Sequence, residues 1–266
     1  MVTDNVPPPA DKGLPFPVAR DIKISAPFRW IALGMRDLAA CPLPALFYGF
    51  CFALMGVSMT LVFEHAYAYA MAATSGFLLL GPFLAMGLYE ISRRTELRQG
   101  CALRPTLTVW RRNAGNIGVF AVVLGLLFLA WARSSLVIFA LFYRGDMPNL
   151  TGFLQQLLVA DNFQFLALYM GAGLIFAIIA FALSLVALPL MLDRNQDAVT
   201  SMLGSIAALL RNPLPLLVWA GVITVLTVAG FLTFHLGLVV LMPIIGHASW
   251  HAYRELIVPL QPIAEE

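Results

Sequence analysis

The sequence predicts an all-α polytopic membrane protein with six transmembrane helices, arranged as three helical hairpins. Hydrophobic residues make up 61% of the 266-residue chain and charged residues only 11%, which is too little charge to cover a water-facing surface. Several uncharged runs reach about 20 residues, the length with which a helix crosses a bilayer core of about 30 Å. These runs lack the alternation of apolar and polar residues typical of membrane β-barrels, so helices are expected.

The two ends of the chain are expected to lie outside the bilayer. Residues 1–24 are polar and proline-rich, with "VPPPA" and "LPFP", which predicts a disordered cytoplasmic tail with no cleavable signal peptide. Residues 25–257 form the expected membrane domain, and residues 258–266 form a short C-terminal tail.

Four spans are expected at residues 43–63, 69–91, 114–143 and 163–192. The last apolar block, residues 213–253, is long enough for two short spans joined by a tight turn at residues 233–237. One long tilted helix with a re-entrant segment would use the same residues, so this alternative stays open.

The distribution of Lys and Arg sets the expected orientation. With six spans, every cation except Arg133 and Arg144 falls on one side of the membrane, which predicts that both termini are cytoplasmic. The net charge of +2 is explained by this topology, and no nucleic-acid partner is expected.

Similar segments precede the expected hairpins. "LGMRDLAACPLPALF" at residues 33–47 is similar to "LGSIAALLRNPLPLLVW" at residues 203–219, and "TLTVWRRNAGNIGVF" at residues 106–120 is a looser version. Each predicts an amphipathic helix in the cytoplasmic interface before a span, and hence hairpin repeats at about 25–98, 99–196 and 197–257. Chance matches in so biased a composition are the alternative.

Polar residues stand at matching distances after a proline in the second helix of each hairpin. Glu90 and His251 come eight residues after Pro82 and Pro243, while Asp193 and His247 come four residues after Pro189 and Pro243. The spacing predicts a polar cluster of Glu90, Asp193, His247 and His251 on the cytoplasmic side, because ionisable groups inside a membrane are costly and mark functional sites. The expected supporting residues are Tyr89, Arg93, Arg94, Arg194, Trp250 and Arg254.

A purely structural role is the alternative. Glu90 could pair with Arg94 at i,i+4, and His and Trp near a helix end are ordinary interfacial anchors. The i,i+4 spacing of His247 and His251 permits a shared zinc or copper ion if Glu90 or Asp193 joined them. Nothing in the pattern requires a metal, so none is assigned and no cofactor is expected.

The three cysteines, Cys41, Cys51 and Cys101, show neither a disulfide framework nor metal-ligand spacing. Their expected role is packing as buried free thiols.

Two motifs point to a family. The elements "GLYEISRR" at residues 87–94 and "GHASWHAYR" at residues 246–254, with "LPLMLDRNQDA" between them, resemble the bacterial integral membrane proteins of domain of unknown function 2189. The resemblance covers about residues 25–257 and implies a multi-pass protein of the inner membrane of Gram-negative bacteria. Some members carry the label of a cytochrome c oxidase component.

The oxidase label can be compared with the residues present. A haem-copper catalytic subunit needs about six histidines, and this chain has 4, so only an accessory or assembly role agrees with the label. We therefore expect a non-enzymatic accessory or scaffold subunit that binds another membrane protein or itself, with small residues such as Gly171 and Gly173 allowing close helix approach. The alternative is a transporter or channel whose cytoplasmic mouth carries Glu90, Asp193 and His251.

Overall fold

The computed structural model describes Val18 and residues 22–65, 70–142 and 163–257, with backbone alone at 63–65 and 70–80. Regular secondary structure in this part of the chain is helical, and the one strand-like contact is an isolated antiparallel bridge between Val18 and Ile257. The expectation of an all-α protein is confirmed. Both expected tails lie mostly outside the described residues.

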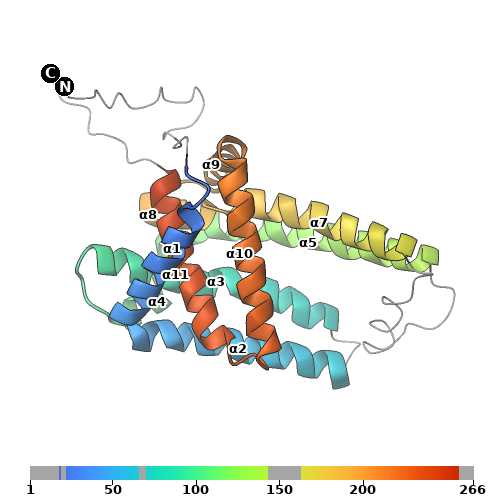
Figure 1. Cartoon of the computed structure of the whole chain (residues 1–266), viewed down its shortest axis with the longest axis horizontal. Helices are drawn as coiled ribbons and strands as arrows, with labels where there is room; N and C mark the ends of the chain where they lie inside the picture. The colour runs from blue at the N-terminus through green and yellow to red at the C-terminus, as the bar shows by residue number, and fades with distance from the viewer. Residues whose placement is uncertain (1–17, 19–21, 66–69, 143–162, 258–266) are drawn as a thin grey trace.

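The helices follow one another as three consecutive pairs with shorter helices between them (Figure 1). The first part contains α1 (Ala26–Ala40), α2 (Pro42–His65) and α3 (Ala70–Glu96). The second part contains α4 (Arg104–Leu107), the 3₁₀ helix η2 (Val109–Asn113), α5 (Ala114–Phe142), α7 (Phe163–Ser184) and α8 (Ala187–Arg194). The third part contains α9 (Ala198–Arg211), α10 (Pro213–Leu232) and α11 (Leu238–Leu256). Within each pair the two long helices pack on one another: α2 on α3, α5 on α7, and α10 on α11.

Among the described residues, four helical segments are long and apolar enough to cross a membrane: Pro42–Val62, Val109–Phe142, Phe163–Arg194 and Pro213–Leu232. They correspond to the expected first, third, fourth and fifth spans. The expected second and sixth spans, in α3 and α11, are not among these four segments. α11 is only 19 residues long and its last three turns carry His247, His251 and Arg254, which lower its mean hydropathy.

The last apolar block forms two helices, as expected. α10 ends at Leu232 and α11 begins at Leu238, so the turn covers residues 233–237. Phe234 and His235 have φ of 54° and 67°, and the Gly237 N–H donates to Thr233 Oγ1 at 2.8 Å. The left-handed backbone and this side-chain acceptor reverse the chain within five residues. The alternative of one long helix is therefore wrong.

The expected fourth span is interrupted. The apolar segment Phe163–Arg194 agrees with the expected span, but its helix has a local break, because α7 stops at Ser184 and α8 starts at Ala187. Pro189 has no N–H to donate to the carbonyl of Leu185, the residue four positions earlier, and its ring crowds that carbonyl. The break turns the last two helical turns, which end at Asp193 and Arg194, into a separate short helix.

The two similar Pro-Leu-Pro segments form corners of the same geometry. Cys41 ends α1 with φ −130° and ψ 60°, and Asn212 ends α9 with φ −129° and ψ 55°. Each N–H donates to the carbonyl four residues back, at 2.9 and 3.1 Å. In both corners proline occupies the first position of the next helix, where its missing N–H costs nothing.

The looser third segment folds differently. In place of an amphipathic helix before α5, residues 104–113 form the four-residue α4 and the 3₁₀ helix η2, so that part of the prediction is wrong. Thr106 Oγ1 donates to Leu103 O at 2.6 Å, and buried Asn113 Nδ2 donates to Met191 O and Gln196 O at 3.1 and 2.8 Å. These side-chain bonds to local and distant backbone carbonyls favour short turns over a continuous helix.

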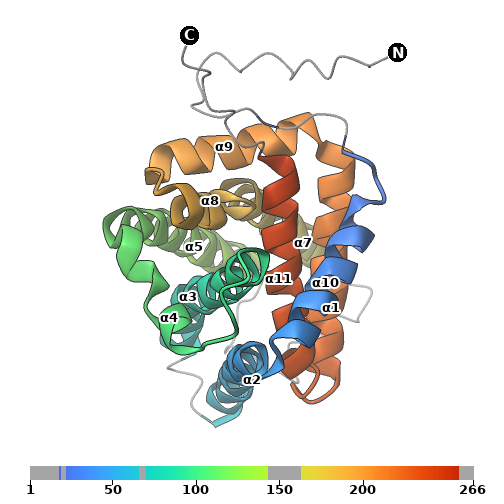
Figure 2. The same cartoon turned by 90° about the vertical axis from the view of Figure 1, so that its left-hand side faces the viewer.

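α11 is the helix around which the first and third parts pack. It contacts α1, α2, α3 and α10, and Figure 2 shows it running through the middle of the molecule. A Cβ atom at Gly34 of α1 would lie 2.7 Å from Ile244 O and 2.9 Å from Ala248 N, and a Cβ at Gly49 of α2 would overlap Val239 O. Glycine therefore lets the two backbones approach α11, as expected for helix packing in membranes.

The connecting segments share a packing pattern. α9 packs on α7 and α8, the α4–η2 segment packs on α3, and α1 packs on α11. α9 precedes the pair α10–α11 and covers α7, the second helix of the preceding pair. In the same way, the α4–η2 segment precedes α5–α7 and covers α3. α1 precedes the first pair and packs on α11, the last long helix. The C-terminal parts α3, α8 and α11 contact one another, so this arrangement brings three helix ends together.

The packing of α1 on α11 predicts an effect of Gly34→Ala. The added methyl group meets backbone atoms that cannot rotate away, so we expect a loss of about 1–3 kcal/mol in the free energy of unfolding. The matched control is Gly221→Ala in α10, where no described atom beyond the local backbone lies within 4 Å of the Cβ position. Thermal unfolding of both purified proteins in detergent checks this, and equal midpoints would contradict the packing argument.

The start of α9 predicts a pH effect. Asp197 Oδ1 accepts the Thr200 N–H at 2.9 Å, and this bond holds the pKa of Asp197 below its ordinary value. A lowered folded pKa means that the capping contribution is present above the unfolded pKa, about 3.9, and is lost as pH falls through the folded value. We expect Asp197→Ala to cost about 1 kcal/mol at neutral pH. Asp197→Asn should keep the cap and remove its acid sensitivity, measured by unfolding between neutral and acid pH.

Candidate functional site

The four predicted cluster residues lie on the three helix ends that meet: Glu90 on α3, Asp193 on α8, and His247 and His251 on α11. Each has a close polar partner on another element, and most of these partners were not among the predicted residues. The contacts divide into two carboxylate groups and two imidazole groups, which are described in turn.

Glu90 is a buried carboxylate held by two guanidinium groups. Its side chain is 1% exposed. Arg93 Nε and Nη2 donate to its two oxygens at 2.7 and 2.8 Å, and Arg112 Nη1 and Nη2 donate to the same oxygens at 3.1 and 3.2 Å. The predicted i,i+4 pair with Arg94 is wrong, because Arg94 Nη2 donates to Gln99 O at 2.9 Å. Two bidentate partners compensate the cost of burying this charge.

Asp193 joins α8 to α11. Tyr253 OH donates to its Oδ2 at 2.7 Å, and Arg254 Nη1 lies 3.6 Å from the same oxygen. Arg254 Nε also lies 3.4 Å from Glu96 Oε2, and Trp250 Nε1 donates to Glu96 Oε1 at 3.0 Å. Arg254 therefore connects an acid on α8 with an acid on α3, and links the three helix ends through one cation.

The two histidines have separate partners. His247 is fully buried, and its Nδ1 lies 2.8 Å from Ser92 Oγ on α3. Its Nε2 has no hydrogen-bond partner among the residues that the structure describes. His251 Nε2 lies 2.9 Å from Asp37 Oδ2 on α1. The described part of the chain contains no group of three or more His, Cys, Asp or Glu side chains arranged to hold a metal ion.

The predicted supporting residues are two buried aromatics, three half-buried arginines and one exposed arginine, Arg254. Trp250 is 1% exposed and Tyr89 9% exposed, so both are core residues and the interfacial-anchor alternative is wrong for Trp250. Arg194 Nη2 lies 3.5 Å from Ile257 O, near the bridge to Val18. It ties the end of α8 to the C-terminal end of α11 beside Asp193.

A second pair of contacts anchors α1 at the same end of the molecule. Trp30 Nε1 donates to Glu255 Oε2 at 2.6 Å, and Arg29 forms an ion pair with the same carboxylate. The Trp30 ring meets Trp219 of α10 edge-to-face at 5.7 Å between centroids. α1 is thus fixed to α11 by polar contacts and to α10 by aromatic packing.

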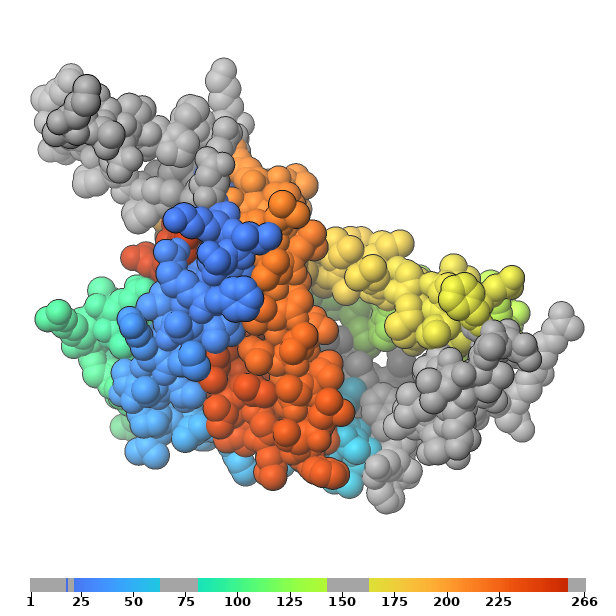
Figure 3. Space-filling view, viewed as in Figure 1, coloured from blue at the N-terminus to red at the C-terminus, as the bar shows by residue number. Residues whose placement is uncertain are grey.

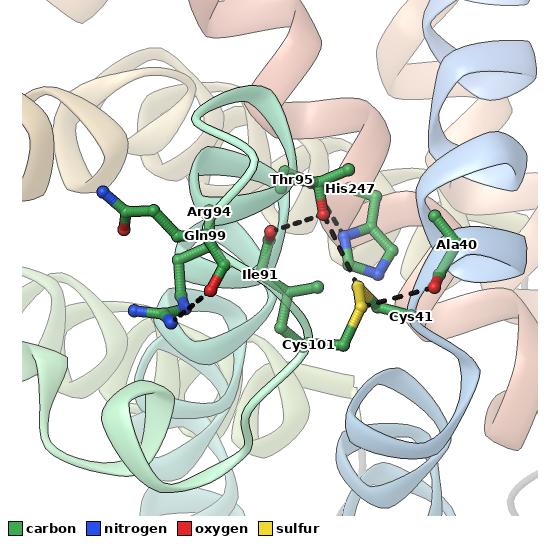
Figure 4. The surroundings of a disulfide bond; sticks show 9 residues. Ala40, Cys41, Ile91, Arg94, Thr95, Gln99, Cys101 and His247 are labelled. Carbon is green, nitrogen blue, oxygen red and sulfur yellow. Dashed lines mark hydrogen bonds between the residues drawn. A yellow bond between two sulfur atoms is a disulfide. The ribbon is translucent and has the colours of Figure 1, made fainter.

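Two of the three cysteines form a disulfide, which corrects the expectation of free thiols. Cys41, at the corner between α1 and α2, is bonded to Cys101 in the loop after α3, with Cα atoms 5.3 Å apart (Figure 4). Cys51 is free. The pairing has a sequence separation of 60 and arises because the loop after α3 folds back on the α1–α2 corner.

Sequence reasoning missed Asp37, Ser92, Glu96 and Arg112 as members of the network. In the sequence, Arg112 is one of the cations that indicate the topology, and Asp37 lies in a repeated amphipathic segment. A signal was present for Asp37, since it is an acid three residues after the glycine at which α1 approaches α11. No local spacing indicates the pairing of Arg112 with Glu90, which are 22 residues apart.

The fold and this paired network define a helical membrane protein whose polar side chains join its helix ends. Residues 70–193 match the model of the family described as "Predicted integral membrane protein (DUF2189)". This is the family that the two motifs predicted, and the motif at residues 87–94 lies within the match. The matched residues run from the start of α3 to Asp193 and so include Glu90 and its two arginines. No curated protein and no solved structure shows a significant match to the chain.

The geometry of Glu90 predicts the effect of its removal. Glu90→Ala leaves the guanidinium groups of Arg93 and Arg112 without their shared carboxylate, and we expect a loss of about 3 kcal/mol in unfolding free energy. Glu96→Ala is the comparison, because the Glu96 side chain is 32% exposed and water replaces its partners more easily. Denaturant unfolding in detergent measures both. A smaller loss for Glu90→Ala than for Glu96→Ala would show that the buried pair does not stabilise the fold.

Proposed function

We propose that the protein is a non-enzymatic accessory, assembly or scaffold subunit of a membrane complex, with a respiratory oxidase as one candidate complex. The family to which residues 70–193 match contains integral membrane proteins, which supports a role inside the bilayer. The proposed ligand is a transmembrane helix of a partner protein, which binds the exposed surface of α5 and α7.

The contrast between two groups of glycines carries this proposal. Gly34, Gly49, Gly87 and Gly246 all sit directly against a neighbouring helix of the chain. At Gly118 and Gly125 of α5 and Gly171 of α7, no described atom beyond the local backbone lies within 4 Å of a Cβ position. Small residues in membrane helices favour close helix approach, so we assign the unoccupied positions of α5 and α7 to a helix of the partner.

The arrangement of α5 and α7 agrees with this role. Only 11% of the apolar window in the segment Val109–Phe142 is buried inside the chain, and Figures 1 and 3 show α5 and α7 extending away from the helices that pack on α11. The exposed residues along α5 and α7 are apolar, including Val122, Leu126, Leu174 and Ile178. Such a surface fits lipid or another transmembrane helix and not water.

We further propose a six-span topology with both termini in the cytoplasm of a bacterial cell. The six proposed spans are the four apolar segments together with α3 and α11. The buried polar ends of α3 and α11 would lie at the cytoplasmic boundary. Arg93, Arg112 and Arg254 lie at this end of the described helices, in agreement with the excess of cations expected on the cytoplasmic side.

Transport is the weaker candidate. A solute path would need ionisable groups that can exchange partners with the solute. Glu90 is held by two arginines, Asp193 by Tyr253 and Arg254, and His251 by Asp37. This mutual pairing favours a structural role for the cluster and leaves the partner-binding role to α5 and α7.

Partner binding is tested by Gly125→Leu and Gly171→Leu. Each puts a large side chain where close helix approach is proposed, and we expect loss of tenfold or more of the co-purified partner, equivalent to about 1.4 kcal/mol. The tagged full chain is isolated from its native membranes in mild detergent, bound proteins are identified, and haem absorbance is measured.

The matched control is Val122→Leu, which changes an exposed α5 residue that is already large. Abundance in the membrane is measured for all three variants, because α5 and α7 should fold normally in each. Full retention of bound partner in both glycine variants would reject the proposed docking surface.

A further inference from the structure

The sulfur atoms of Cys41 and Cys101 each have a polar neighbour suited to a thiol. Cys101 Sγ lies 3.3 Å from Ala40 O, and Cys41 Sγ lies 3.6 Å from Thr95 Oγ1 (Figure 4). A carbonyl oxygen can only accept a hydrogen bond, and a disulfide sulfur carries no hydrogen to donate. The Ala40 contact therefore becomes a hydrogen bond only when Cys101 is reduced, and the site accommodates the dithiol as well as the disulfide.

The two sulfurs differ in access. Cys101 is exposed in the loop after α3, whereas Cys41 is 2% exposed. An attacking thiolate can therefore approach the Cys101 sulfur, while the Cys41 sulfur is shielded by the protein. This asymmetry between an exposed and a buried cysteine suits stepwise exchange, in which one sulfur is attacked and the other is the leaving group.

The environment of the buried sulfur also fits exchange. Figure 4 draws His247 and Thr95 among the residues that surround the disulfide. His247 Nδ1 is engaged by Ser92, and its buried Nε2 has no hydrogen-bond partner among the described residues. His247 is therefore the candidate for moving a proton to or from this sulfur.

We propose that Cys41 and Cys101 form a reversible thiol–disulfide exchange site that reacts with low-molecular-weight thiols of the cytoplasm. The inference rests on the proposed cytoplasmic placement of this end of the molecule and not on partner docking by α5 and α7. Disulfides in the cytosol are rare and are usually transient, catalytic or redox-sensing, so a disulfide at a cytoplasmic helix corner serves exchange better than permanent stabilisation.

The reaction consists of two thiol–disulfide steps. A small thiolate attacks Cys101 Sγ, the bond between Cys101 and Cys41 breaks, and its electron pair passes to Cys41 Sγ, which takes a proton through His247. A second small thiol then attacks the mixed disulfide and releases Cys101 as a thiol. Two small thiols are oxidised to one small disulfide while the protein disulfide is reduced to two thiols, and the reverse sequence restores it.

Opening the bond would loosen a loop that reaches the polar network. The segment after Cys101 carries Thr106, whose Oγ1 lies 2.8 Å from Tyr48 OH of α2, and Arg112, which binds Glu90. In the oxidised form this segment is tied to the α1–α2 corner; in the reduced form only noncovalent contacts hold it. The redox state of the pair thus controls how firmly Arg112 is held at Glu90.

Thiol trapping in cells tests the exchange. Cells that express the full chain are quenched in acid, and free thiols are labelled with a maleimide that shifts the protein on a gel. We expect Cys41 and Cys101 to be reduced in untreated cells, disulfide-bonded after diamide, and reduced again after removal of the oxidant. Purified protein in mixtures of reduced and oxidised glutathione should show the same reversible change.

Variants assign the signal to this pair. Cys41→Ser and Cys101→Ser should each abolish the change in maleimide labelling caused by diamide, whereas Cys51→Ser, which removes the free cysteine of α2, should keep that change. In the purified protein, trypsin should cut after Arg98 about tenfold faster after reduction, because a cross-link that restrains the loop is lost. Cys101→Ser should be cut at the faster rate under all conditions.

Two results would overturn the proposal. A pair that stays oxidised in untreated cells and resists glutathione is a permanent structural disulfide, and a pair that stays reduced after diamide does not exchange. A reporter fused after Glu266 is assayed in the same cells. Activity outside the cytoplasm would reject the topology without bearing on co-purification by α5 and α7, so the two proposals fail separately.

The role of His247 is tested by the rate of exchange. His247→Gln should slow reduction by glutathione by about tenfold or more, because proton transfer by a positioned side chain contributes at least this much. The position of the glutathione equilibrium should change little. His251→Gln is the control, since His251 lies on the same helix but is bonded to Asp37. Equal rates in wild type and His247→Gln would remove His247 from the site.

Discussion

The close approach of α1 and α2 to α11 is the constraint on which the rest of the structure depends. Gly34 and Gly49 place the backbones of α1 and α2 against carbonyl oxygens of α11, at a separation that no larger side chain permits. Lipid tails are as apolar as the helices, so packing contacts and not burial from water must hold such helices together. Once α1 and α11 lie at this distance, Asp37 reaches His251 and Trp30 reaches Glu255.

The polar network follows from that packing. With α11 fixed against α1 and α3, its last turns carry His247, Tyr253 and Arg254 to partners on two other helices: Ser92 and Glu96 on α3, and Asp193 on α8. Each buried charge finds an opposite charge or a hydrogen-bond donor, as a low-dielectric interior requires. Figure 4 draws His247 of the same helix end among the residues around the Cys41–Cys101 bond, and His247 belongs both to the stabilising network and to the proposed exchange site.

Particular elements show why some predictions from the sequence held and others did not. The turn at residues 233–237 was predictable because the apolar block is too long for one span and contains a local breaker at Gly237. The equal corners at Cys41 and Asn212 come from the same local Pro-Leu-Pro chemistry. In contrast, residues 104–113 form short turns because Asn113 bonds to Met191 O and Gln196 O, and the sequence around Asn113 carries no sign of those acceptors.

The sequence by itself determined the helical membrane class, the tight turn before α11, the family and the presence of polar residues at the ends of α3, α8 and α11. These features depend on composition, on runs of apolar residues and on motifs, all of which are local along the chain. Only the tertiary structure decided that Glu90 pairs with Arg112, that His251 pairs with Asp37 and that Cys41 is bonded to Cys101. Those pairings join residues from 22 to 214 positions apart, and their distances depend on how closely whole helices pack.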